Sequence, residues 1–317
     1  MNESQISTHD WRAAGLRYYA YNFHLRQRYG GRVQKVSLDA GFTCPNVDGT
    51  VAVGGCTFCD NRSFSPSRRV KRAQIADQLA DGMRRLKWRY DVAKFIAYFQ
   101  PATNTYAPVE RLRPLYEAAI DHPDVVGLAI GTRPDCVPDD VMQLLTEMAG
   151  RTHLSVEYGL QTMHDWSLVA MNRGHGHAVT VEAIERSRGR GFEICVHVML
   201  GLPGETRDEM LATAAEVARL NVDAVKIHNV YAVQNTPLGE DVLAGRAQLL
   251  ERDEYVQIVV DFIEQLPPTC IVERVSGEAP PKYLIGPAWC LDKPALRTAL
   301  EAEFARRDTW QGRVYRP

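Results

Sequence analysis

The chain alternates regularly between short apolar segments and amphipathic segments, and this order restricts the folds open to it. Six segments rich in β-branched and other apolar residues are predicted as strands: Val33–Leu38, Ala93–Phe99, Val125–Ile130, Leu154–Tyr158, Ile194–Leu200 and Ala224–Val230. The amphipathic segments between them are predicted as helices: Ala73–Arg89, Leu115–Ile120, Asp139–Met148, Val181–Arg188 and Arg207–Leu220. This alternation indicates an α/β fold with parallel strands joined by right-handed crossovers. Six units favour a partial (β/α)6 barrel of the TIM type, with an open doubly wound sheet as the alternative.

The segments on either side of this alternation have a different character. We predict an N-terminal cap rich in aromatic residues over 1–32, the barrel over 33–235, and a C-terminal α/β extension packed on the barrel over 236–317. The extension contains a predicted helix at Arg252–Gln265, a strand at Ile271–Val275 and a last helix near Lys293–Arg306. No flexible linker separates the three parts.

The charge balance excludes a strongly basic nucleic-acid-binding protein. With 37 Lys and Arg against 39 Asp and Glu, the net charge is −2, so no DNA partner is expected. Two local basic groups remain, the second interleaved with aromatic residues: Arg68, Arg69, Lys71 and Arg72, and Arg84, Arg85, Lys87 and Arg89 with Trp88 and Tyr90. Such groups either hold RNA through phosphate contacts and base stacking, or form the solvated face of a helix.

The sequence gives no indication of a membrane partner. No apolar segment reaches the length of a membrane span, and the polar N-terminus carries charges of both signs, unlike a secretory signal. We therefore expect a cytoplasmic protein. In a reducing compartment the seven cysteines are expected to be free thiols or metal ligands, not disulfides.

Three of the cysteines, Cys44, Cys56 and Cys59, lie within sixteen residues directly after the first predicted strand. This position is the carboxyl end of the strand, the face that carries the chemistry in TIM-type barrels. Soft thiolates select iron–sulfur clusters, zinc or copper. Three ligands leave one position open, as a catalytic cluster requires, whereas structural zinc needs a fourth ligand from elsewhere in the chain. From these residues alone, a cluster and a zinc site are both open.

The end of this loop, Cys56-Thr-Phe58-Cys59, resembles the signature of the radical S-adenosylmethionine (SAM) superfamily, in which an aromatic residue precedes the last cysteine. The usual signature has only a few residues between the first two cysteines, whereas eleven, Pro45 to Gly55, intervene here. This longer loop resembles the YhcC-like branch of the superfamily, which is related to the radical SAM domain of the Elongator catalytic subunit. The resemblance runs from about Tyr18 to Gly312 and includes Thr132-Arg-Pro-Asp135, Glu157-Tyr-Gly-Leu-Gln161, Gly201-Leu-Pro-Gly-Glu-Thr206, Ala288-Trp-Cys-Leu-Asp-Lys293 and Trp310-Gln-Gly312.

The resemblance implies a [4Fe–4S] cluster on the three cysteines, with SAM bound to the open iron. It also implies Arg173 as the partner of the SAM carboxylate, because arginine offers a planar bidentate fork. Gln161, twelve residues earlier, has the spacing of a second residue that faces SAM in related enzymes. Glu157 faces the barrel interior if its neighbours face the helices, since side chains alternate along a strand. The alternative for Glu157 is an internal salt bridge with Arg133 or Lys226.

Further candidate contacts to SAM come from the ends of other predicted strands. They are Phe58 in the cluster loop, Asn104 in the loop after the second strand, Arg133 after the third, and His197 and Gly201 on and after the fifth. The Gly-Leu-Pro-Gly turn resembles the superfamily's motif beside the adenine, and His197 is a candidate for the ribose hydroxyls or, alternatively, a core histidine. His228 and Asn229, at the end of the sixth strand, are candidates for the substrate side.

The resemblance implies a reaction in which the reduced cluster cleaves SAM to methionine and a 5′-deoxyadenosyl radical, which removes a hydrogen atom from the substrate. A tRNA base is one candidate substrate, and an electron donor such as flavodoxin or ferredoxin is an expected partner. No catalytic side chain is identified from the sequence. Two other hypotheses stay open: a zinc-stabilised RNA-binding module without catalysis, and a non-catalytic scaffold that keeps the cluster.

Overall fold

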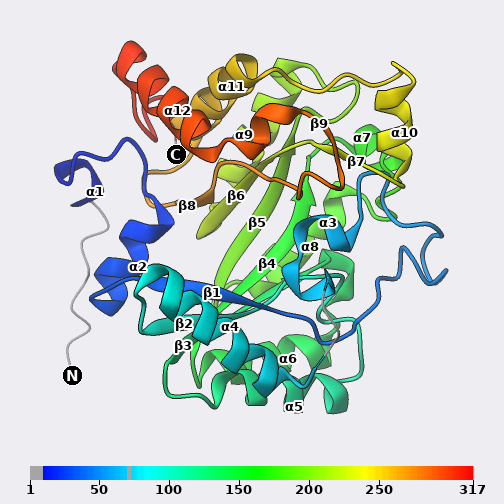
Figure 1. The fold of residues 1–317 in the computed structure, drawn as a ribbon, viewed down its shortest axis with the longest axis vertical. Helices are drawn as coiled ribbons and strands as arrows, with labels where there is room; N and C mark the ends of the chain where they lie inside the picture. Colours follow the sequence, from blue (N-terminus) through cyan, green and yellow to red (C-terminus); the bar gives the residue numbers. More distant parts are fainter. Residues whose placement is uncertain (1–9, 70–72, 317) are drawn as a thin grey trace.

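A curved parallel sheet of seven strands, in the order β1-β2-β3-β4-β5-β6-β8, forms the centre of the protein (Figure 1). The computed structural model describes residues 10–69 and 73–316. Within them, the first and last strands of this sheet do not pair with each other, so the sheet curls into a partial barrel. Its strands are β1 (Val33–Leu38), β2 (Lys94–Phe99), β3 (Val125–Thr132), β4 (His153–Gln161), β5 (Glu193–Leu200), β6 (Ala224–Asn229) and β8 (Ile271–Arg274).

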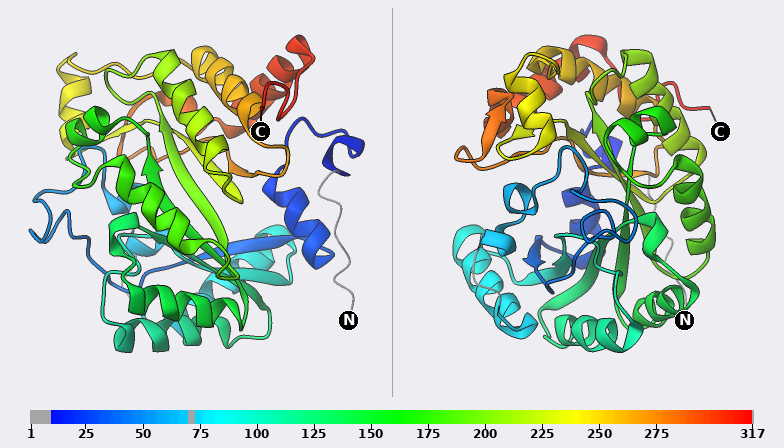
Figure 2. Two further views of the ribbon diagram at one scale, coloured as in Figure 1. Left: turned by 180° about the vertical axis from the view of Figure 1, so that it is seen from behind. Right: turned by 90° about the vertical axis from the view of Figure 1, so that its right-hand side faces the viewer.

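Helices cover the outer side of this sheet (Figure 2). They are α4 (Ile75–Tyr90), α5 (Val109–Ile120), α6 (Asp139–Ala149), α8 (His177–Ser187), α9 (Arg207–Arg219), α11 (Arg252–Gln265) and α12 (Lys293–Arg307). Alternate strand residues such as Val156 and Tyr158 join these helices in one continuous apolar core. The intervening residues point to the concave side, where Glu157 is buried. The predicted α/β partial barrel is confirmed.

Three elements differ in their start or their pairing from the sequence-based prediction. The predicted strand Ile271–Val275 is present as β8, but it pairs in parallel with β6 and so extends the main sheet. Helix α5 begins at Val109, because Pro108 stands at its N-cap and Pro114 is accommodated inside the helix. Helix α8 begins at His177, four residues before the predicted start.

The N-terminal segment lies against the open side of the barrel (Figure 1). Its helices are α1 (Asp10–Ala13) and α2 (Tyr21–Tyr29). Ala20 forms an isolated parallel bridge to Val272, and the indole of Trp11 donates a hydrogen bond to the Pro268 carbonyl. These contacts join the aromatic N-terminal segment to the C-terminal segment. The exact division of the chain at 32/33 and 235/236 stays a prediction.

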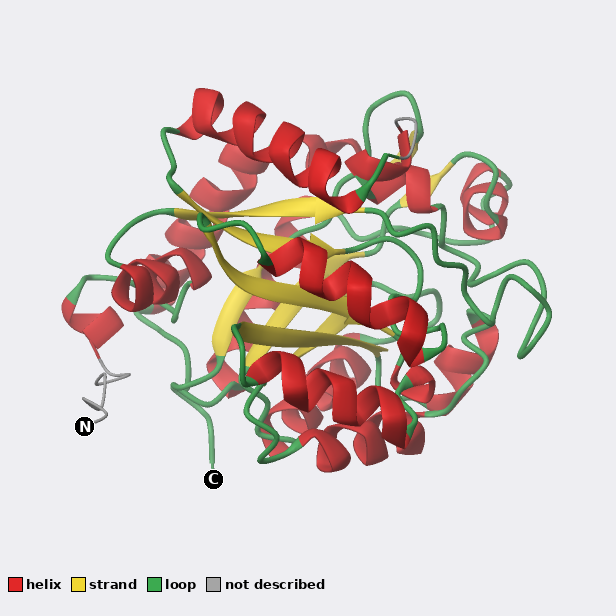
Figure 3. Ribbon diagram, turned by 90° about the horizontal axis from the view of Figure 1, so that it is seen from below, coloured by secondary structure: helices red, strands yellow, loops and turns green. Residues whose placement is uncertain are grey.

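Short elements surround the carboxyl ends of the strands (Figure 3). They include α3 (Asn61–Phe64), α7 (Asp165–Ala170), α10 (Pro237–Leu243), the 3-10 helices η1 (Pro66–Arg69), η2 (Pro134–Cys136) and η3 (Ala288–Leu291), and the two-stranded ribbon of β7 (Ala232–Val233) and β9 (Leu284–Gly286). No helix among the described residues is long and apolar enough to cross a membrane.

Candidate cluster and cofactor site

A cavity of about 840 Å³ lies on the concave side of the sheet and contains all three cysteines of the predicted triad. Every strand of the seven-stranded sheet contributes lining residues, from Lys35 on β1 to Arg274 on β8. Two segments outside the sheet also line the cavity: Tyr21 and Leu25 from α2, and the segment from Glu278 to Pro281. A volume of this size is in the range of cofactor and substrate sites.

The cysteine loop is held in place by backbone and amide contacts. Gly54 and Gly55 have positive φ angles of 86° and 80°, a conformation that glycine adopts without steric cost. The side-chain amide of Asn172 donates to the Gly55 carbonyl at 2.8 Å and to the Val53 carbonyl at 3.2 Å. The loop is therefore clamped to the segment after α7 before any ligand binds.

The three cysteine thiols lie close enough to influence one another. Burial, followed by the thiols of Cys56 and Cys44, raises the pKa of Cys59 to about 12, and Arg173 opposes this shift. Cys59 is therefore a neutral thiol at physiological pH in the absence of metal. Thiolates are the form that binds iron, so metal binding here releases protons.

The surroundings of the triad fit a cluster with SAM bound to it. Arg173 is only 6% exposed, its Nη1 is 3.8 Å from Cys56 Sγ, and its Nε is buried without a hydrogen-bond partner. Among the described residues, no three Cys, His, Asp or Glu side chains surround a single ion position. The thiolates of a cluster bind separate iron atoms and do not have to converge on one point.

The four remaining cysteines do not line this cavity. Cys195 and Cys270 are buried in the core, and Cys290 is buried in η3. Cys136 lines a separate cavity of about 730 Å³ on the other side of the cysteine loop. The structure therefore separates the triad from the scattered cysteines, as the sequence spacing suggested.

Arg173 is oriented by its neighbours. Its Nη2 donates to the Gly159 carbonyl at 2.8 Å, and its own carbonyl accepts from Arg133 Nη1 at 2.8 Å. A Cβ at Gly159 would lie 2.6 Å from both Arg173 Nη2 and Gln161 Nε2, so a side chain here would displace both groups from their present positions. The predicted pair Gln161 and Arg173 is thus brought together at the end of β4.

Six of the eight residues proposed for SAM contact line the cavity: Phe58, Arg133, Glu157, Gln161, Arg173 and His197. Two others lie outside its lining. The amide of Asn104 donates to the Phe99 and Gly131 carbonyls and holds the loop after β2. Gly201 has a φ of 90°, and a Cβ there would lie 2.8 Å from Leu250.

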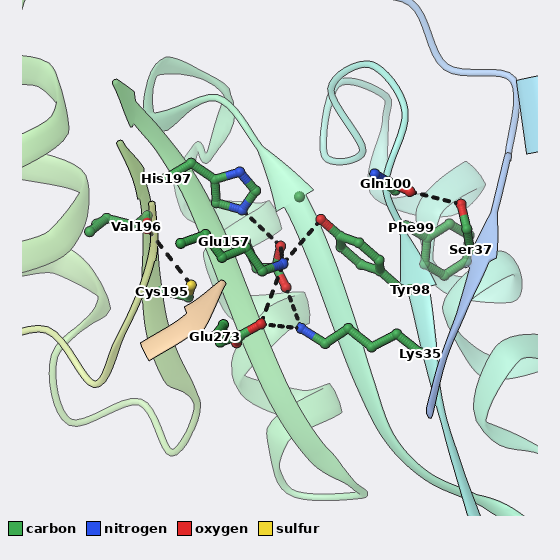
Figure 4. A network of polar contacts seen from close by, with 12 residues as sticks. Lys35, Ser37, Tyr98, Phe99, Gln100, Glu157, Cys195, Val196, His197 and Glu273 are labelled. Atoms are coloured by element: carbon green, nitrogen blue, oxygen red, sulfur yellow. Dashed lines mark hydrogen bonds and ion pairs between the residues drawn. The ribbon is translucent and has the colours of Figure 1, made fainter. Parts of the chain in front are cut away.

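Glu157 takes part in a buried network of charges on the concave side of the sheet (Figure 4). It accepts from Lys35 Nζ at 2.8 Å and from His197 Nε2 at 2.9 Å, and it also pairs with Lys226. Glu273 Oε2 pairs with the same two lysines, at 2.6 Å and 3.4 Å. Of the two salt-bridge partners expected for Glu157, Lys226 does pair with it. Arg133 is not, because its guanidinium is bound bidentately to Asp135 at 2.8 and 2.7 Å.

Opposite charges keep this network ionised despite its burial. Burial opposes ionisation of Glu157, but Lys226 and Lys35 hold its pKa well below the ordinary value. Burial likewise disfavours the charged form of Lys35, and Glu157 and Glu273 raise its pKa well above the ordinary value. Burial lowers the pKa of His197, against the hydrogen bond that its ring donates to Glu157, so it is neutral at pH 7.

Lys35, Tyr98 and Glu273 were not among the residues predicted from the sequence. Tyr98 Oη is 3.3 Å from Lys226 Nζ, so this hydroxyl also belongs to the network. The available signal was a charged residue within a predicted strand, which Lys35 and Glu273 both provide. That signal does not tell which charges meet.

The predicted basic groups are mostly engaged within the protein. Arg68 pairs with Asp39 at 3.1 Å and donates to the Phe42 carbonyl, while exposed Arg69 lines the cavity. Lys71 and Arg72 lie outside the described residues. On α4, residues of the second group pair with acids: Arg84 and Arg85 with Asp81, and Lys87 with Asp124. This second group behaves as a solvated helix face.

A partial barrel with a three-cysteine loop after its first strand defines the radical SAM class, and the chain belongs to the radical SAM superfamily. The superfamily model matches residues 50–217, and the Radical_SAM C-terminal domain model matches residues 222–306. Members of this superfamily are generally enzymes, and they typically bind a [4Fe–4S] cluster and SAM. Within it, the chain belongs to the YhcC/YtqA family.

The whole-length relatives place the chain in that family. It is 42% identical to the uncharacterized protein YtqA of Bacillus subtilis, over 94% of this chain and 93% of that one. It is 39% identical to the protein YhcC of Escherichia coli K12, over 84% of this chain and 85% of that one. A partial match, 27% identical over 50% of this chain, is the tRNA uridine(34) acetyltransferase of Methanocaldococcus jannaschii, of which only 30% is covered.

A solved structure with the same fold is the archaeal Methanocaldococcus infernus Elp3 lacking residues 1–46 of its N-terminus. The TM-score is 0.68 at 16% identity, covering 88% of this chain. The chain spans 64% of the length of that Elp3 chain. At 16% identity this similarity shows a shared fold and nothing more.

Proposed function

We propose that the protein cleaves SAM reductively at a [4Fe–4S] cluster and directs the resulting 5′-deoxyadenosyl radical at a substrate in the barrel cavity. The observation that carries this proposal is that Cys44, Cys56 and Cys59 line one cavity together with a buried arginine, whose Nη1 is 3.8 Å from Cys56 Sγ. A cation beside an open cluster position suits the carboxylate of SAM.

The residues of the chain have distinct parts in this proposal. Cys44, Cys56 and Cys59 hold the cluster, Arg173 binds the SAM carboxylate, and Arg133 orients Arg173 through its carbonyl. Because the reaction consumes an electron, a small electron carrier such as flavodoxin or ferredoxin is the proposed partner.

A tRNA base is the proposed substrate. Support comes from the tRNA-modifying relative named above and from the solvent-exposed Arg69 in the cavity lining. The match to this relative covers only half of this chain, so it supports tRNA as the class of substrate. A base is held by stacking and edge contacts inside the cavity, while phosphates bind to cations at its mouth.

Anaerobic reconstitution with iron and sulfide tests the proposal. A cluster gives broad absorbance near about 400 nm from sulfur-to-iron charge transfer, and a zinc module does not. With dithionite as reductant, the reconstituted protein should convert SAM to methionine and 5′-deoxyadenosine, both measured by mass spectrometry. A protein that assembles the cluster, binds SAM and yet never cleaves it would support the non-catalytic scaffold.

Arg173→Met should weaken SAM binding without preventing cluster assembly. The substitution keeps most of the side-chain length but removes the charge, and a charged hydrogen bond is worth about 1.5–3 kcal/mol. The dissociation constant for SAM is therefore expected to rise roughly 10–100-fold, as measured by isothermal titration calorimetry on the iron-loaded protein. Arg297→Met, at an arginine whose side chain is 76% exposed on α12, is the matched control. Equal SAM affinity in folded Arg173→Met and wild type would remove Arg173 from the carboxylate site.

Arg69→Glu tests the tRNA proposal. If Arg69 contacts a phosphate, charge reversal should weaken tRNA binding and lower the slope of log affinity against log salt by about 1. Filter binding at several salt concentrations measures both, with Arg297→Glu as the control. A wild-type protein without salt-sensitive tRNA affinity would shift the proposal to a small-molecule or peptide substrate.

A further inference from the structure

The ends of β6 and β8 bring together three polar residues that the buried network and the proposed SAM contacts do not use. His228 and Asn229 end β6, and Arg274 ends β8. All three line the main cavity. They come from segments about 45 residues apart in the chain, so only the pairing of β6 with β8 places them side by side.

Arg274 points into the cavity because β8 is irregular at this point. The register with β6 shifts between Val225 and Lys226, and Lys226 lies opposite Arg274. Such a bulge re-aims a side chain, and it lets Glu273 and Arg274, neighbours in sequence, both line the same cavity.

Arg274 is the unbalanced charge of this region. Lys35 and Lys226 are matched by Glu157 and Glu273. Arg274 is an exposed residue. No Asp or Glu within the described part of the chain lies within ion-pair distance of its guanidinium. Burial first, and then His197 and Arg274, lower the pKa of His228 well below its ordinary value, so His228 adds no charge at pH 7. The region therefore carries a net positive charge that faces the cavity.

Two buried hydrogen-bonding groups accompany this charge. Asn229 is 1% exposed, and its Oδ1 accepts the Gly277 N–H at 2.8 Å. Its Nδ2, a donor, is buried without a partner, and so is Nε2 of His228, which donates in one neutral tautomer. Buried polar groups are rarely left unpaired, because each costs the free energy of its lost hydration.

The segment after β8 fixes these groups in place. A Cβ at Gly277 would lie 3.0 Å from the Tyr231 ring and 3.2 Å from His228 Nδ1. The backbone therefore packs directly against the two rings, and the Gly277 N–H determines which way the Asn229 amide points. The donors are held in position in the ligand-free protein, which reduces the ordering cost of binding.

We propose that this group of residues, His228, Asn229 and Arg274, binds an anionic group of the substrate, a carboxylate or a phosphate. The Arg274 guanidinium supplies a bidentate charged contact, and Asn229 Nδ2 and His228 Nε2 donate to the remaining oxygens. Glu273 Oε1, a buried acceptor without a partner beside this site, fits an N–H or O–H donor on the same ligand. The inference rests on the proposed function, because it places this anion on the molecule that the radical attacks.

Binding of small anions to the SAM-loaded, iron-loaded protein tests the inference, since bound SAM keeps the probes from Arg173. The probes are inorganic phosphate, acetate and, as the neutral control, acetamide, and the binding of each is measured by isothermal titration calorimetry. At least one anion should bind more tightly than acetamide. Arg274→Gln should weaken the binding of that anion roughly 10–100-fold. Arg246→Gln, at an exposed arginine paired with Asp241, should leave this binding unchanged.

The outcomes separate the sources of the anion. Binding of phosphate alone assigns a phosphate of a nucleotide or RNA, binding of acetate alone assigns a carboxylate, and binding of both supports a general oxyanion site. Arg274→Lys, which keeps the charge, should restore part of the affinity. Equal anion binding by wild type and folded Arg274→Gln, or no preference of the wild type over acetamide, would overturn the inference. SAM cleavage by the wild-type protein is measured separately. If the proposed function is wrong and this inference is right, the protein will bind the anion but will not cleave SAM.

Discussion

Replacing any one of Cys44, Cys56 or Cys59 by alanine is expected to abolish iron binding and SAM cleavage together. The three thiolates are the protein ligands proposed for the cluster, and each lines the same cavity. Loss of one leaves two ligands, too few to retain a cluster with one iron kept open for SAM. Iron and sulfide per chain, and 5′-deoxyadenosine formed under reducing conditions, measure the two effects.

The four scattered cysteines provide matched controls for this experiment. Cys136, Cys195, Cys270 and Cys290 are all buried, so their replacement by alanine removes a thiol of the same size. Each variant should keep the wild-type iron content. If one of them proved as necessary as the triad, the site would have four protein ligands, and the zinc-stabilised module would become the better hypothesis.

Glu157→Gln is expected to cause the largest loss of folding stability among the charge substitutions proposed here. The Glu157 side chain has no exposed surface and neutralises Lys35 and Lys226. Removing one partner of a buried ion pair leaves an uncompensated charge, which costs about 3–5 kcal/mol. The free energy of unfolding of the metal-free protein in urea measures this loss. Glu147→Gln, at an exposed carboxylate paired with Arg113, is the control and should change little.

The stability difference between wild type and Glu157→Gln should depend on pH in a defined direction. The folded-state pKa of Glu157 is well below the ordinary value of 4.5. Its contribution to the free energy of unfolding is therefore fully present above about pH 4.5 and is lost as the pH falls through the folded-state pKa. The pKa of Lys35 is raised above 10.5. Its contribution to the free energy of unfolding is therefore fully present below about that pH and is lost as the pH rises through the folded-state pKa. A difference that grows on acidification would contradict this assignment of charges.

Local sequence patterns predicted the barrel strands well, because each strand buries one face against helices. Val156 and Tyr158 are apolar and face the core, and Glu157 between them faces the cavity, as two-residue alternation requires. The start of α5 needed revision, because Pro114 inside the helix obscured it. The packing of Gly201 against Leu250, about fifty residues away, could not be predicted from local sequence.

The spacing of the cysteines and the strand–helix order were enough to determine the class of fold and the position of the proposed cluster. Both depend on residues close together in the chain, where covalent geometry limits the possible arrangements. Only the tertiary structure decided that β8 completes the sheet, that Lys35 pairs with both Glu157 and Glu273, and that Arg274 faces the cavity without a carboxylate partner. The two ion pairs of Lys35 join segments more than a hundred residues apart, and burial of charge selects among many pairings that the sequence alone leaves equally open.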